Sequence, residues 1–100
     1  MIAVKRIEIV IDAAHTPELV RAVKAAGAPG YTLVRDVQGS GDRGDRTGDG
    51  LGNVYRNCYL IVAASEDIAQ AIVDSTRPLL ERYVGVCLIT DAQLLRHRDT

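Results

Sequence analysis

The sequence predicts an α+β fold in which two helices cover one face of an antiparallel sheet. Strand-like and helix-like segments follow one another in the order β-α-β-β-α-β. The strand-like segments carry apolar residues in alternation or in short runs, and the helix-like segments carry them at helical spacing. Apolar residues make up 47% of the 100 residues, enough for the core of a single domain spanning residues 1–100. This order of elements is the ferredoxin-like pattern.

The first strand is predicted over residues 4–12, because apolar and polar residues alternate there. Its buried face consists of Ile7, Ile9 and Ile11. Thr16 opens the first helix as a capping residue, with Pro17 at the first helical position. The buried stripe of this helix consists of Leu19, Val20, Val23 and Ala26. Gly27 is expected to end the helix in a left-handed cap, and a second strand is predicted over residues 31–37.

The second half of the chain repeats this alternation. A third strand is predicted over residues 54–63, and Ser65 opens a second helix as its capping residue. Pro78 lies inside the apolar pattern of that helix and should kink or split it. A fourth strand is predicted over residues 86–90, and residues 91–100 form a polar tail.

Both faces of the third strand are apolar. One face consists of Val54, Cys58, Leu60 and Val62. The other face consists of Tyr55, Tyr59, Ile61 and Ala63. Two helices can cover one face of the sheet, so something else must cover the second. We expect a homo-oligomer with its sheets packed inward, because the polar tail would be a poorer cover.

Charge and composition exclude several classes of protein. A net charge of −1 argues against general electrostatic binding to nucleic acid or to an anionic membrane. The sequence shows no signal peptide and no apolar run long enough to span a bilayer, so we expect a cytoplasmic protein. Cys58 and Cys87 are expected to be reduced, buried thiols. No spacing of cysteine and histidine suggests a zinc site.

Residues 39–53 form a glycine-rich loop that contains six of the nine glycines. Its start, Gly39 to Gly44, matches G-x-G-x-x-G, but no helix follows, so it is not a dinucleotide fingerprint. Glycines allow several backbone N–H groups to point at one anion, and Arg43 and Arg46 add positive charge. Two interpretations remain open: a loop that cradles phosphate, and a flexible hairpin connection without a ligand.

Other charged residues give weaker signals. Asp42, Asp45 and Asp49 lack the spacing of a calcium loop and are expected to be solvated, so no metal is predicted. The basic cluster Arg96-His97-Arg98 is either an exposed chain end or a phosphate clamp. His15 is expected to be a surface or capping-region residue. No constellation of nucleophile and base predicts a catalytic residue.

With these motifs in place, the chain resembles the PII signalling proteins over nearly its whole length. The matching features are the order of elements, Gly30-Tyr31-Thr32, the segment from Val37 to Gly41 that leads into the loop, and the turn from Tyr83 to Val86. The two arginines of the loop, Arg43 and Arg46, make it most similar to the PII-like relatives associated with bicarbonate transport and carboxysomes.

The resemblance implies a homotrimer that binds adenine nucleotides in clefts between subunits. It also implies that residues 39–53 are a T-loop, which changes shape with the ligand and docks onto a bicarbonate transporter or a carboxysome-related protein. The implied nucleotide-binding residues are Gly39, Ser40, Gly41 and Arg43 in the loop, Gly85 in the B-loop, and Arg96 and Arg98 at the chain end. Arg46 is implied by the PII-like relatives alone.

Departures from the PII pattern bear on the choice of ligand. Val86 replaces the B-loop lysine and Val84 replaces its acidic partner, so ADP, AMP or cyclic AMP is favoured over ATP. No tyrosine occurs between Gly39 and Asn53, so the usual uridylylation site is missing. The cysteine-pair tail of some transporter partners is also absent, which favours the carboxysome-associated branch and implies a response to bicarbonate.

Three functions therefore compete. The first is a non-enzymatic sensor of adenine nucleotide and bicarbonate that signals through its loop. The second is a slow nucleotide hydrolase, for which Asp42, Asp45 and Glu8 are the candidate bases. The third is a CutA-like structural or metal-tolerance trimer, which would bind no nucleotide. The glycine and arginine residues of the loop favour the sensor.

Overall fold

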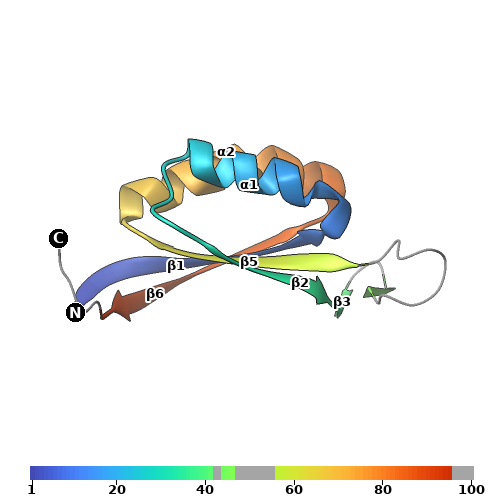
Figure 1. Ribbon diagram of the computed structural model, residues 1–100, viewed down its shortest axis with the longest axis horizontal. Helices are drawn as coiled ribbons and strands as arrows, with labels where there is room; N and C mark the ends of the chain where they lie inside the picture. Colours follow the sequence, from blue (N-terminus) through green and yellow to red (C-terminus); the bar gives the residue numbers. More distant parts are fainter. Residues whose placement is uncertain (42–43, 47–55, 96–100) are drawn as a thin grey trace.

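A computed structural model describes residues 1–41, 44–46 and 56–95. A four-stranded antiparallel sheet in the order β2-β5-β1-β6 carries both helices on one face (Figure 1). In chain order the elements are β1 Ile2–Asp12, the 3₁₀ helix η1 Ala13–His15, α1 Thr16–Ala25, β2 Thr32–Val37, β3 Gly39–Gly41, β4 Gly44–Arg46, β5 Asn57–Ala64, α2 Glu66–Tyr83 and β6 Val86–Leu94. The predicted ferredoxin-like fold class is confirmed.

The core fills the layer between the sheet and the helices. Alternate residues of the two central strands face the helices, because successive side chains of a strand point to opposite faces. The fully buried ones in the strands are Ile7, Ile9, Ile11, Cys58, Leu60 and Val62. Leu19 and Val23 of α1 and Ile72 of α2 close the layer from above. The predicted inward faces are therefore confirmed for the described residues of both central strands, and Val54 lies outside these residues.

The two helices begin differently. Ser65 caps α2 as predicted, since its Oγ accepts a hydrogen bond from the Ile68 N–H at 3.4 Å. The prediction that Thr16 caps α1 is wrong, because its hydroxyl donates back to the Ala13 carbonyl at 2.8 Å. The reason is η1, which precedes the helix and is itself capped by Asp12. His15 occupies the N-cap position of α1 without a capping side-chain hydrogen bond.

Pro78 does not split the second helix. α2 is continuous from Glu66 to Tyr83, so the split that the sequence allowed is not observed. Proline has no backbone N–H, so Pro78 cannot donate a hydrogen bond to the carbonyl of Asp74, four residues earlier. Pro78 and Asp74 are both exposed, so water can solvate that carbonyl. On the buried side the Thr76 hydroxyl donates to the Ile72 carbonyl at 2.7 Å.

The last strand is longer than predicted. β6 continues past Thr90 to Leu94, so residues 91–94 belong to the sheet and not to a polar tail. Its extension pairs with the start of β1, where Ile2 lies opposite Leu94. The polar residues of this extension lie beyond the core, so they gave no apolar pattern from which a strand could be predicted. Lys5 of β1 neutralises Asp91 through an ion pair.

Part of the predicted loop is regular. β3 and β4 pair in antiparallel register, with Gly39 opposite Arg46 and Gly41 opposite Gly44. The sequence did not predict these strands, since glycine is depleted in strands and gives no side-chain pattern. Residues 42–43 and 47–53 of the predicted loop lie outside the described residues.

The candidate functional site

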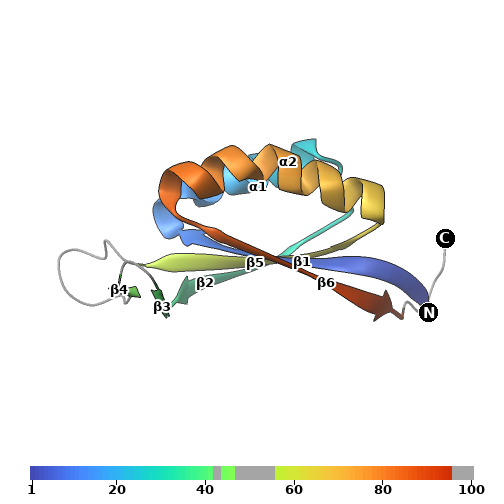
Figure 2. The same cartoon turned by 180° about the vertical axis from the view of Figure 1, so that it is seen from behind.

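β3, β4 and the turn after α2 lie at the same end of the sheet (Figure 2). The strand register agrees: Val10 pairs with Val86 at the start of β6, and Asp12 pairs with Asn57 at the start of β5. Val37, the last residue of β2, also pairs with Asn57. The fold therefore brings both stems of the predicted loop and the turn before β6 to one edge, which we call the loop end.

Gly85 is held in the turn by close packing. Its N–H donates to the Leu80 carbonyl at 2.9 Å. A Cβ built on Gly85 would lie 2.5 Å from Leu80 Cδ2 and 3.0 Å from the Val10 carbonyl oxygen. Glycine is thus required here by the contact between the turn and β1, independently of any ligand. Because its N–H is already paired, a ligand would use other groups of the turn.

A groove of about 330 Å³ runs beside this turn, between α2 and β6. It is lined by Val73, Thr76, Arg77, Leu80, Glu81, Gly85, Cys87 and Ile89. Arg77 supplies a cation and Glu81 an anion, so the groove carries no net charge from these two side chains. Burial raises the pKa of the Cys87 thiol, which keeps it protonated at neutral pH.

The base of the loop has two charged residues that sequence reasoning missed. Asp36 lies in an irregularity of β2 and has a φ of 59°. Its Oδ1 lies 3.7 Å from Nη1 of Arg56, the residue before β5, so an ion pair joins the two stems. The Arg56 carbonyl also accepts a hydrogen bond from the Ala13 N–H at 2.8 Å. The only sequence signal that could have indicated Asp36 and Arg56 was their position on either side of the predicted loop.

His15 and Tyr83 meet at the loop end. Their rings stack with centroids 3.4 Å apart and planes 14° apart. His15 Nδ1 also lies 3.1 Å from Glu18 Oε1. The sequence placed His15 in the capping region and assigned no partner to it. The stack could not be found by motif, because the two residues are far apart in the chain.

The structure brings together some predicted site residues, and others lie outside the residues that it describes. Gly39, Ser40 and Gly41 form β3, and Arg46 ends β4, all at the loop end. Arg43, Arg96 and Arg98 lie outside the described residues. β6 is nine residues long and leads away from Gly85, and a strand of that length spans about 26 Å. Leu94, the last residue of β6, therefore lies at the end of the sheet opposite Gly85.

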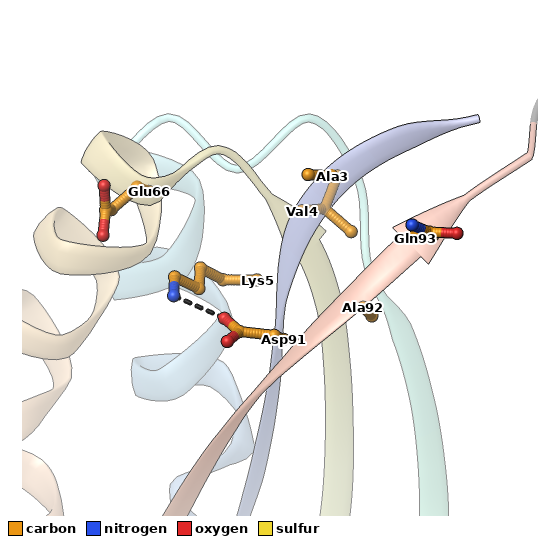
Figure 3. A pocket seen from close by; sticks show the side chains of 7 residues that line it. All are labelled: Ala3, Val4, Lys5, Glu66, Asp91, Ala92 and Gln93. Atoms are coloured by element: carbon orange, nitrogen blue, oxygen red, sulfur yellow. Dashed lines mark hydrogen bonds and ion pairs between the residues drawn. The ribbon is translucent and has the colours of Figure 1, made fainter.

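A larger cavity of about 520 Å³ lies at that opposite end (Figure 3). It is lined by Ala3, Val4, Lys5, Glu66, Asp91, Ala92 and Gln93, none of which is a predicted site residue. The hydrogen bond and the charge of Asp91 raise the pKa of Lys5. This ion pair links β1 to β6 at the wall of the cavity (Figure 3).

The face of the sheet opposite the helices carries a hydrogen-bonded group in its centre. Glu8 Oε2 accepts a hydrogen bond from the Tyr59 hydroxyl at 2.7 Å, and Arg6 Nε lies 2.9 Å from Glu8 Oε1. The bond to Glu8 raises the pKa of Tyr59. Both oxygens of Glu8 are engaged away from the loop end, so Glu8 is poorly placed as a base for a nucleotide bound there.

Apolar residues surround this group. Val34, Val86 and Leu88 are 43%, 64% and 54% exposed. By strand alternation these residues lie on the face that the helices leave open. An uncovered apolar face is thus present, as predicted. Of the residues predicted for it, Tyr59, Ile61 and Ala63 are half-buried, and Tyr55 lies outside the described residues.

Within the described residues no cluster of histidine, cysteine and carboxylate side chains could hold a metal ion. Cys58 and Cys87 are free thiols; Cys58 is buried as predicted, and Cys87 is half-buried. Neither α1 nor α2 is long and apolar enough to cross a membrane.

Comparison with known proteins identifies the family. A model of the family described as nitrogen regulatory protein P-II matches residues 4–99, so the chain belongs to that family. No curated protein matches the sequence. The P-II family consists of signalling proteins, and the fold and the predicted resemblance agree with this class.

Solved structures agree with this assignment. CPII, a nitrogen regulatory PII-like protein from Thiomonas intermedia K12, was solved bound to ADP, AMP and bicarbonate. It is 26% identical, with a TM-score of 0.85 over 95% of this chain and 91% of CPII. A second CPII structure, bound to ADP and bicarbonate, has a TM-score of 0.82 at 26% identity, with the same coverage of both chains. The GlnK-ATP complex of B. subtilis shares the fold alone, at 15% identity and a TM-score of 0.63 over 91% of this chain and 84% of GlnK.

Proposed function

We propose that this protein is a non-enzymatic sensor of adenine nucleotide and bicarbonate. It works as a homotrimer, binds its ligands at the interfaces between subunits, and signals through residues 39–53 in inorganic-carbon metabolism. Its output is the binding of that loop to a bicarbonate transporter or a carboxysome-related protein. Membership of the P-II family and the ligands of CPII support this reading.

The observation that carries the proposal is the length of β6, which places Gly85 and Leu94 at opposite ends of the sheet. Gly85 precedes the first residue of β6, and the tail with Arg96 and Arg98 follows its last residue. Both groups can contact one nucleotide only if the tail of one subunit reaches the loop end of the next. A ring of three subunits makes three such sites and buries the open apolar face of each sheet.

The charges at the turn support a preference for ADP or AMP. Val84 and Val86 flank Gly85, and neither can neutralise a third phosphate. Arg43 and Arg46 of the loop and Arg96 and Arg98 of the tail supply the cations that contact the remaining phosphates and bicarbonate. Cyclic AMP, with a single phosphate charge, also fits this set of groups.

The test is direct binding of ADP, AMP, cyclic AMP and ATP, each with and without bicarbonate, by calorimetry. We expect ADP or AMP to bind most tightly, and Arg98→Ala to weaken binding at least tenfold, about the effect of losing one charged hydrogen bond. Arg21→Ala, on the exposed side of α1, is the matched control and should bind normally. Sustained release of phosphate would contradict the sensor and favour a hydrolase.

A mixing experiment tests the inter-subunit site itself. Arg43→Ala disables the loop side and Arg98→Ala disables the tail side, so neither variant alone should bind ADP well. Unfolding and refolding the two variants together should restore some intact sites, because some interfaces then pair an intact loop with an intact tail. If mixing restores no binding while mass measurement finds mixed trimers, the site does not lie between subunits.

A further inference from the structure

The turn between α2 and β6 contains a strained residue. Val84 has φ 58° and ψ 48°, the left-handed region. A β-branched side chain is a clear outlier there, and such a conformation persists only when its surroundings hold it. Gly85, the next residue, fits against Leu80 and the Val10 carbonyl without room for a side chain. The shape of this turn therefore depends on the contacts that hold its two ends.

Tyr83 supplies such a contact on the helix side of the turn. Its ring stacks on His15 at 3.4 Å between centroids, and the Arg82 guanidinium carbon lies 5.4 Å from the Tyr83 ring centroid. His15 is held in turn by Glu18 at 3.1 Å. The last residue of α2 is thus fixed against the segment that leads into α1, directly before the strained residue.

The same segment also holds the stem of the loop. At the two ends of η1, the Ala14 N–H donates to Asp12 Oδ1 at 3.1 Å, and the Thr16 hydroxyl donates to the Ala13 carbonyl at 2.8 Å. The Ala13 N–H in turn donates to the Arg56 carbonyl at 2.8 Å. A short, internally bonded segment, residues 12–16, therefore contacts the loop stem at one end and Tyr83 at the other.

We propose that His15 and Tyr83 are positioning residues. Their stack holds the Val84–Gly85 turn in the shape that accepts a nucleotide and, through η1, connects that turn to the loop stem at Arg56. The inference rests on the proposed function, in which the nucleotide binds beside the turn. A nucleotide that binds more tightly to one conformation of the turn then also favours one conformation of the loop stem. Neither ring has to contact the ligand.

The first experiment separates positioning from general stability. His15→Ala and Tyr83→Leu remove the stack, whereas His15→Phe and Tyr83→Phe keep two flat rings. Calorimetry should show ADP binding weakened about threefold to tenfold by the first two, the range of an aromatic pair. The two phenylalanine variants should bind near the unaltered value. Replacing His15 also removes its contact with the Glu18 carboxylate. Glu18→Gln removes that charge and keeps both rings, so it is the matched control.

The second experiment follows the connection to the stem. Hydrogen exchange at the Ala13 amide reports its bond to the Arg56 carbonyl. Saturating ADP should slow this exchange in the unaltered protein and in His15→Phe. In His15→Ala at the same saturation, ADP should leave the exchange unchanged, because the link between the turn and η1 is gone.

Three results would contradict the positioning role, the connection to the loop stem, or the proposed function. If His15→Ala lowers the melting temperature but binds ADP with unchanged affinity, the stack is structural and the inference is wrong. If ADP slows exchange at Ala13 equally with and without the stack, the connection to the stem does not pass through His15. If the unaltered protein binds no adenine nucleotide, the proposed function fails, and the inference with it.

Discussion

The two faces of the sheet are made by alternate residues of the same strands, yet they differ in what they need. On the helix side, Ile7 and Ile9 of β1 are fully buried within one chain. Glu8, which lies between these two isoleucines in the sequence, points to the other side. Its partner across the strands, Leu88 of β6, is 54% exposed. On the helix-covered face, the inward residues of the two central strands are already buried in a single chain. The open face has the composition of a surface that a second copy would cover.

The open face also differs in how its polar groups are arranged. The Arg6–Glu8–Tyr59 group satisfies both oxygens of its carboxylate internally. A carboxylate that is fully hydrogen-bonded can be covered by an apolar partner surface at a much lower cost than an unpaired one. The group therefore does not prevent the open face from becoming an interface, and three substitutions test the contrast between the faces.

The largest effect is expected on the helix-covered face. Ile9→Ala should lower the free energy of unfolding by about 2–5 kcal/mol, because it removes buried methyl groups and leaves a cavity. Denaturant unfolding should show this loss at every protein concentration. A loss below about 1 kcal/mol would mean that the core around Ile9 can collapse to fill the space.

A different kind of loss is expected on the open face. Leu88→Asp places a charge among apolar residues, which should abolish assembly and leave each subunit folded. Sedimentation should show monomers, while circular dichroism retains the helix and strand signals. Arg21→Ala, on the exposed side of α1, changes the net charge by the same amount and is the control. A trimer that survives Leu88→Asp would show that this face is not the interface.

The smallest effect is expected from Tyr59→Phe and appears with pH. Because the folded protein raises the pKa of Tyr59, the folded state holds the phenol proton more tightly than the unfolded state. This stabilisation is fully present below the ordinary value of 10.0 and is lost as the pH rises through the folded pKa. Lys5 contributes a loss of the same sign at alkaline pH.

Tyr59→Phe should therefore make the decline in melting temperature above pH 10 shallower without removing it. Tyr31→Phe is the matched control, because Tyr31 is exposed and lies outside the Arg6–Glu8–Tyr59 group. An unchanged decline in Tyr59→Phe would mean that the phenol contributes nothing to the pH dependence of stability.

The candidate site was predicted only in part. The resemblance led to Gly85 and to the glycines of the loop, and the structure adds a packing reason for Gly85. The ion pair between Asp36 and Arg56 and the stack of His15 on Tyr83 were not predicted. Each joins residues that belong to different elements, and no local pattern records which elements will meet.

The sequence by itself determined the two helices, the four strands of the main sheet and the inward faces of the two central strands. The alternation that ends at Ile11, the apolar stripe of α1, and the positive φ of 95° at Gly27 all follow from local patterns, since each depends on neighbouring residues and on burial. The tertiary structure decided where partners far apart in the chain meet. β6 extends to Leu94 because β1 begins at Ile2 and offers it a hydrogen-bonding edge. α2 remains continuous through Pro78, because the packing of the helix against the sheet contributes more stability than the loss of a single hydrogen bond removes.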